Sequence, residues 1–232
     1  MTRQSSSLWL AMGLPPLLFL GVIIVAAIFI GFMAKGDPQA IAEQVPAAMP
    51  TILLIVQLLL GLFLFWLKGK ETLDWSQLGW HTPTKYDIGV GIGVGLVMAL
   101  AYFFLLAPFL AYLQRTLGDY VPPGEILATL ANGKTAFFIA NVLLAPFVEE
   151  TIYRGYALPK LLQRYSPGIA LVLSCLFFGL LHWSGGFWYI ILTGSIAGGL
   201  FAGLYRWRGN LIAPYAAHLT LNFIEFLFTW TM

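Results

Sequence analysis

The chain has 232 residues, of which 59% are hydrophobic and 9% are charged, and its mean hydropathy is +0.84. Soluble domains have about 45–50% apolar residues, so this composition excludes an ordinary soluble protein and indicates a membrane protein. The formal net charge of +2, without clusters of Lys and Arg, argues against a nucleic-acid partner. The single cysteine, Cys175, excludes an internal disulfide framework.

Seven hydrophobic runs follow one another along the chain, at about residues 8–33, 49–67, 87–113, 135–156, 168–183, 187–205 and 211–230. Continuous apolar runs of this length are typical of transmembrane helices, whereas strands that cross a membrane alternate in polarity. The first run has 26 residues and is too long for the core of a cleaved signal peptide. We therefore predict an all-α polytopic membrane helix bundle with about seven transmembrane helices, embedded in the lipid bilayer.

The polar residues are unevenly distributed over these runs. The first three runs contain no Asp, Glu, His, Lys or Arg away from their ends, and the segment GVGIGVG at 89–95 predicts close approach to another helix. The last four runs contain Glu149, Glu150, Arg154, His182, His218, Asn222 and Glu225. We therefore predict one membrane domain in two parts, with scaffold helices in residues 1–134 and a catalytic helical core in residues 135–232.

The Lys and Arg residues between the runs predict the orientation of the chain. If the N-terminus lies in the cytoplasm, eight of these residues lie inside and three outside. Cytoplasmic loops carry the excess of positive charge, so we predict a cytoplasmic N-terminus and an external C-terminus.

Two adjacent glutamates lie within the fourth apolar run. Neighbouring residues of a helix point about 100° apart, so Glu149 and Glu150 cannot serve the same purpose. Glu150 and Arg154 are spaced i, i+4, which suits an ion pair that neutralises itself. Glu149 then has no local partner, and it must find one on another helix or stay protonated.

His182 is predicted to lie level with Glu149. Ser166–Pro167 is the natural chain reversal between them, and each residue is about 16 positions from it. At 1.5 Å per residue, both lie roughly 24 Å from the turn in an antiparallel helical hairpin.

The last run adds a second histidine. His218 and Asn222 are spaced i, i+4 and project to one side of their helix. A lone buried histidine is often a packing residue, and His81, in a polar loop, is given no role. Two histidines within membrane spans are costly and indicate a site. Cys175 is roughly 10 Å along the helix from His182, too far for a nucleophilic pair, and is interpreted as a core residue.

Three motifs on these runs resemble one known family. They are EETIYR at 149–154, FGLLH at 178–182 and HLTLN at 218–222, which fit Glu-Glu-x-x-x-Arg, Phe-x-x-x-His and His-x-x-x-Asn. Their order resembles the CAAX-protease and bacteriocin-processing (CPBP, or ABI) family of intramembrane proteases, which includes type II CAAX prenyl endopeptidases. The resemblance covers about residues 135–230.

The resemblance implies a role for each matching residue. Glu149 would be the catalytic carboxylate, and Glu150 with Arg154 would support it. His182 would act with Glu149 on the water or a metal, and His218 with Asn222 would stabilise the oxyanion. It also implies a bacterial inner membrane, a membrane-associated or lipidated peptide or protein as substrate, and possible roles in bacteriocin immunity.

Two chemical routes to peptide hydrolysis are open. In one, Glu149 and His182 activate water directly. In the other, Glu149, His182 and His218 bind a zinc ion that lowers the pKa of its water to about 7. Asn222 carries an amide donor suited to an oxyanion. We predict an endopeptidase and favour the metalloprotease route.

Two other classes of function compete with a protease. Glu and His within membrane spans also form proton relays of transporters, but a transporter is expected to show two related halves, and the halves here are unlike. A non-catalytic scaffold or immunity protein is the other alternative.

Overall fold

The computed structural model describes residues 3–121 and 133–231, and all regular elements in this part of the chain are helices. In chain order they are α1 (Arg3–Met33), α2 (Pro38–Ala47), α3 (Met49–Lys70), α4 (Lys85–Ala101), η1 (Tyr102–Leu106), α5 (Ala107–Leu117), α7 (Lys134–Phe137), η2 (Phe138–Leu144), α8 (Ala145–Glu150), η3 (Thr151–Ala157), α9 (Leu158–Leu162), α10 (Pro167–Leu181), η4 (Trp183–Gly185), α11 (Phe187–Leu192), η5 (Thr193–Ala197), α12 (Gly198–Arg208) and α13 (Ile212–Thr231). The predicted all-helical fold is confirmed.

Five helical stretches in the described residues are long and apolar enough to cross a membrane, namely Ser7–Met33, Met49–Lys70, Lys85–Leu117, Lys134–Leu162 and Phe187–Arg208. The predicted runs at 168–183 and 211–230 correspond to two shorter apolar helices, Pro167–Leu181 and Ile212–Phe228. The chain is an integral membrane protein, and the number of about seven crossings stays a prediction.

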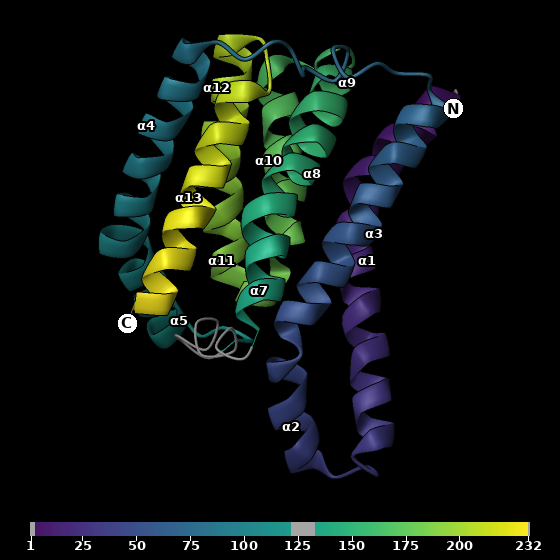
Figure 1. The fold of residues 1–232 in the computed structure, drawn as a ribbon, viewed down its shortest axis with the longest axis vertical. Helices are drawn as coiled ribbons and strands as arrows, with labels where there is room; N and C mark the ends of the chain where they lie inside the picture. The colour runs from purple at the N-terminus through teal and green to yellow at the C-terminus, as the bar shows by residue number, and fades with distance from the viewer. Residues whose placement is uncertain (1–2, 122–132, 232) are drawn as a thin grey trace.

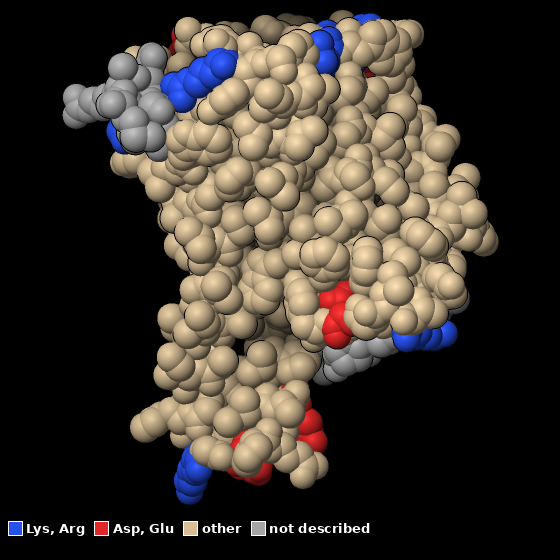
Figure 2. All heavy atoms as spheres, turned by 180° about the vertical axis from the view of Figure 1, so that it is seen from behind, with Lys and Arg blue, Asp and Glu red and all other residues tan. Residues whose placement is uncertain are grey.

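The helices form a bundle with a projecting arm. In Figure 1, α1 and α3 run along one flank, and the arm that extends past the other helices is formed by the lower part of α1 and by α2. Figure 2 shows charged residues near one edge of the bundle, near its opposite edge and at the tip of the arm. The broad surface between these charges is almost wholly uncharged on the face in view, as expected for a lipid-facing belt.

Several helices contain a π-helical segment. These segments, η1, η2, η3 and η5, lie within the spans Lys85–Leu117, Lys134–Leu162 and Phe187–Arg208. A π-helical turn widens the backbone ladder and changes the direction of the following side chains, and such turns are frequent at functional sites. Two of them, η2 and η3, lie directly before and directly after α8, the short α-helix that carries Glu149 and Glu150.

The close helix approach predicted for residues 89–95 is confirmed between α4 and α13. A Cβ atom at Gly91 would lie 2.5 Å from the carbonyl oxygen of Ala213, and one at Gly95 would lie 2.5 Å from that of Ala217. Only glycine fits at such positions. Since Ala217 directly precedes His218, this packing fixes the height and rotation of the helix that carries the last motif.

Candidate active site

The network around α8 begins with a buried charge cluster. Glu150 and Arg154 have no exposed surface, and Arg154 Nη1 donates to Glu150 Oε1 at 3.0 Å. The predicted ion pair is therefore confirmed. Arg154 Nη2 donates to the carbonyl oxygen of Gly198 at 3.0 Å, so the guanidinium also joins α12 to this helix.

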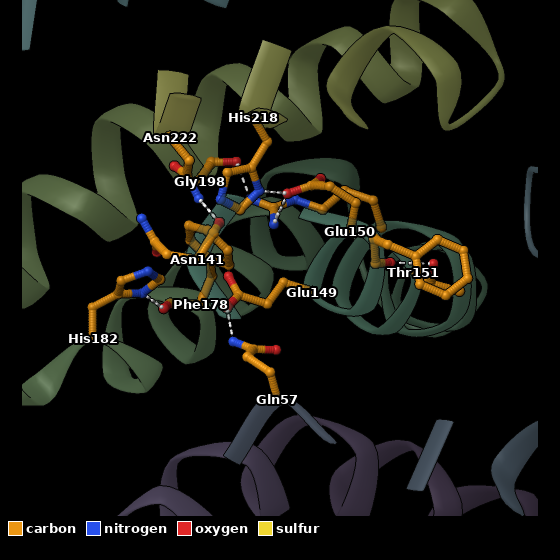
Figure 3. A network of polar contacts seen from close by, with 12 residues as sticks. Gln57, Asn141, Glu149, Glu150, Thr151, Phe178, His182, Gly198, His218 and Asn222 are labelled. Atoms are coloured by element: carbon orange, nitrogen blue, oxygen red, sulfur yellow. Dashed lines mark hydrogen bonds and ion pairs between the residues drawn. The ribbon is translucent and has the colours of Figure 1, made fainter. Parts of the chain in front are cut away.

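Glu150 has a second partner that the sequence motifs do not indicate. His218 Nδ1 lies 2.9 Å from the same Oε1 atom of Glu150 (Figure 3). A carboxylate oxygen accepts, so Nδ1 carries the proton, and Nε2 of a neutral His218 is left as an acceptor. Glu150 therefore orients the imidazole of α13, as carboxylates orient histidines in many active sites.

Aromatic rings fill the space between these charges. The Arg154 guanidinium carbon lies 4.0 Å from the centroid of Phe178, and the ring of Phe201 stacks on His218 at 4.7 Å between centroids. Phe178 also contacts the ring of His182, at 4.9 Å. Phe178 also lies 6.1 Å from His218 between ring centroids, so the phenylalanine of the Phe-x-x-x-His motif contacts residues of all three motifs.

Glu149 finds its partner on α3. Gln57 Nε2 donates to Glu149 Oε1 at 2.8 Å, and the two side chains are 6% and 4% exposed. The expectation that Glu149 needs a partner on another helix is met by this hydrogen bond. Sequence analysis missed Gln57, because a single Gln in an apolar run carries no pattern that points to a glutamate 92 residues later.

The other carboxylate oxygen of Glu149 has a different environment. Among the described residues, no side chain or backbone group gives Glu149 Oε2 a hydrogen bond, although this atom is buried. The hydroxyl of Tyr153, one helical turn further, is likewise buried without a partner there. Glu149 thus has one oxygen held by the protein and one oxygen available to another molecule.

His182 lies directly after α10. Its Nδ1 atom is 2.8 Å from the carbonyl oxygen of Phe178, so Nδ1 carries the proton and Nε2 of the neutral ring is an acceptor. In Figure 3, His182, Glu149, His218 and Asn222 surround the same region between the helices. The sequence-based placement of His182 near Glu149 agrees with this view.

The turn after His182 is held by the segment that follows α5. Asp119 accepts hydrogen bonds from the backbone N–H groups of Phe187 and Trp188, at 2.8 and 3.3 Å, and Tyr120 donates its hydroxyl to the carbonyl of Trp183. Burial raises the pKa of the Asp119 carboxyl, but these backbone donors outweigh burial, and the pKa is lowered from its usual value. Asp119 therefore caps the start of α11 and anchors the turn that carries His182.

Asn222 bonds to the backbone of η2. Its Nδ2 atom donates to the carbonyl oxygen of Asn141 at 2.7 Å. In a π-helical turn this carbonyl would accept from residue 146, but Pro146 has no N–H to donate. Asn222 supplies the missing donor with one of its two amide hydrogens.

An apolar cavity of about 150 Å³ adjoins this network. His182, His218 and Asn222 line it, together with side chains from α4, η1, α5, α10, α11, η5, α12 and α13. The cavity thus brings two of the three sequence motifs to one internal surface.

The three predicted zinc ligands do not form a metal-binding group in this structure. Among the described residues, no three His, Cys, Asp or Glu side chains lie close enough together to hold a metal ion. Glu149 is held by Gln57, whereas His218 is held by Glu150. Zinc binding by Glu149, His182 and His218 stays a prediction.

The fold and the site define a helical membrane protein with two buried carboxylates and two oriented histidines. Residues 131–224 match the family model described as type II CAAX prenyl endopeptidase Rce1-like. This match confirms the resemblance indicated by the three motifs. No curated protein and no solved structure matches the chain. Gln57 lies outside the matched segment.

Proposed function

We propose that this protein is an intramembrane endopeptidase that hydrolyses a peptide bond of a membrane-associated or lipidated protein or peptide. The observation that carries the proposal is the buried carboxylate of Glu149, with Oε1 fixed by Gln57 and Oε2 unpartnered within the described protein. A general base must have one oxygen within reach of a water molecule, and a fixed second oxygen sets its direction. The match to a family of membrane proteases supports this assignment.

In the proposed reaction, Glu149 Oε2 removes a proton from a water molecule while the water oxygen bonds to the carbonyl carbon of the substrate. The carbonyl oxygen becomes an oxyanion. Collapse of this intermediate breaks the C–N bond, and the proton held by Glu149 passes to the leaving amine. The products are a carboxylic acid and an amine, so the atoms balance without any further reactant.

The histidines and Asn222 act on the same intermediate. His182 Nε2 is an acceptor near Glu149 and assists the proton transfer. The second amide hydrogen of Asn222 is the proposed oxyanion donor, with His218 beside it on the same face of α13. Glu150 and Arg154 act through His218: they hold its ring and bond α8 to α12.

The substrate class follows from the surroundings of the site. The matched family is described as type II CAAX prenyl endopeptidase Rce1-like, a name that refers to prenyl groups. A site between apolar helices, beside an apolar cavity, favours a substrate that is already bound to the membrane. We therefore propose a lipidated or otherwise membrane-bound peptide as the substrate.

The experiment that tests this function uses protein purified in detergent and a library of membrane-bound peptides, with cleavage detected by mass spectrometry. Wild-type protein should produce fragments that the Glu149→Gln variant does not. Glu43→Gln, at an exposed position on α2, is the matched control and should cleave as the wild type does. If no peptide in the library is cleaved, or if Glu149→Gln cleaves at the wild-type rate, the proposed function is wrong.

Metal content separates the two chemical routes. The metal-free account expects full activity in protein with well under one equivalent of any transition metal, and no loss on treatment with a permeant chelator. If activity falls with chelation and returns with added zinc, the metal route holds, and the side chains must rearrange from the positions described above.

A further inference from the structure

The polar face of α13 continues beyond the candidate active site. His218, Asn222 and Glu225 are spaced i, i+4 and i+7, so they share one face of the helix, and all three line the cavity. At 1.5 Å per residue, Glu225 lies roughly 10 Å from His218 along the helix axis. The proposed reaction gives no role to Glu225, which lies outside the segment that matches the family model.

The charged side chains that line the cavity were compared by sign. Among the described residues that line it, Glu225 is the only acid, and none is Lys or Arg. Most of the wall is aliphatic, and its aromatic side chains are Tyr102, Phe178, Tyr189 and Phe201. Such surroundings have a low dielectric constant, so a carboxylate there attracts a cationic group and repels another carboxylate strongly.

The size of the cavity suits one side chain. Its volume of about 150 Å³ is below the roughly 300–1,000 Å³ of sites for drug-sized ligands. His182, His218 and Asn222, which are assigned to the reaction, line the cavity, and Glu225 lines it further along α13. A lysine side chain combines an apolar stem with a compact ammonium group, which matches the apolar wall and the acid beyond it.

We propose that this cavity is a substrate subsite that accepts a long apolar side chain with a cationic end, in the manner of lysine, and that Glu225 recognises the ammonium group. The subsite rests on the proposed function only in its assumption that the peptide bond lies beside His218 and Asn222. An uncharged side chain of the same length is accepted less well, and a side chain that ends in a carboxylate is rejected.

The test measures binding, so that its outcome does not depend on catalysis. Immobilised Glu149→Gln protein is incubated with N-palmitoylated hexapeptides that carry Lys, norleucine or Glu at each position in turn, and retained peptides are quantified by mass spectrometry. At one position, Lys should be retained roughly tenfold more than norleucine, as expected for a hydrogen bond to a charged group, and Glu least. In Glu149→Gln/Glu225→Gln this ratio should fall to near one, whereas Glu149→Gln/Glu43→Gln should keep it.

Two results overturn the subsite: no position that prefers Lys, or an unchanged preference after Glu225→Gln. Should that variant fail to yield monodisperse protein, Glu225→Asp takes its place and must keep a reduced preference for Lys. A clear preference for Lys in a protein that cleaves no peptide refutes the proposed function but leaves the subsite standing. Cleavage by wild-type protein without any preference for Lys supports the proposed function but refutes the subsite.

Discussion

The two parts of the chain contribute unequally to the candidate site. Residues 133–222 supply both glutamates, Arg154, both histidines and Asn222, whereas α1 to α5 supply one side chain that bonds to a candidate catalytic residue, Gln57. That one side chain holds the carboxylate that we assign to the reaction. A segment without any motif can therefore set the geometry of a motif residue, and a family match confined to residues 131–224 does not reveal it.

The largest effect is expected from Glu149→Gln, in the motif-bearing part. The variant keeps an oxygen that accepts from Gln57 but loses the base, and positioned general bases contribute roughly 10²–10⁴-fold to rates. Peptide cleavage should therefore fall by at least about 100-fold, while the melting curve in detergent stays close to that of the wild type. A large loss of stability would show that Glu149 is a structural residue.

Arg154→Ala should have the largest effect on stability. It leaves Glu150 as a buried charge with only His218 as partner, and breaking a buried pair in this way costs roughly 3–5 kcal/mol. Thermal unfolding in detergent measures the loss. Lys160→Ala is the comparison, because the Lys160–Glu71 pair is partly exposed and should contribute about 0–1 kcal/mol. Equal losses of thermal stability in the two variants would contradict the distinction between the buried pair and the partly exposed pair.

Gln57→Leu tests the contribution of α3. Loss of a hydrogen bond to a charged group costs about 1.5–3 kcal/mol, so kcat should fall by roughly 10- to 150-fold with a small change in KM. Val56→Ala, at the neighbouring buried position, is the control: it should lower stability and leave kcat nearly unchanged. If Gln57→Leu and Val56→Ala have the same effect on kcat, Gln57 serves packing alone.

Asp119→Asn should have a smaller effect, through the turn that follows His182. The carboxylate accepts from two backbone N–H groups of α11, and an amide accepts them less strongly. The pKa of Asp119 is lowered in the folded protein, so its contribution is complete above about pH 4 and is lost as pH falls through the lowered value. The difference in melting temperature between wild type and Asp119→Asn should thus shrink at low pH. A constant difference would refute the role of the charge.

The sequence was sufficient for the helices and for the identity of the polar residues within them. Long apolar runs predict helices, and the i, i+4 spacing of Glu150 and Arg154 predicts a pair within one helix, because both signals are local. Contacts between helices depend on rotation and depth, which local patterns do not fix. This is why the sequence does not predict the bond between His218 Nδ1 and Glu150 that the structure shows.

Two further features also depend on tertiary structure. Asn222 donates to a backbone carbonyl that lacks a helical donor because of a π-helical turn and a proline. The HLTLN motif alone predicts neither this turn nor the register of α13. The packing of α13 on Gly91 and Gly95 sets that register. The glycine segment was recognised in the sequence, but its partner helix was not.

The most direct test of the central claim is a single-turnover cleavage in H₂¹⁸O, with excess purified protein over a substrate from the peptide library. If Glu149 activates water, the new C-terminal carboxylate of the product carries one ¹⁸O atom, the Glu149 side chain carries none, and Glu149→Gln gives no product. Product without ¹⁸O, or ¹⁸O in the Glu149 carboxylate, would show that Glu149 attacks the substrate itself, and would contradict the account.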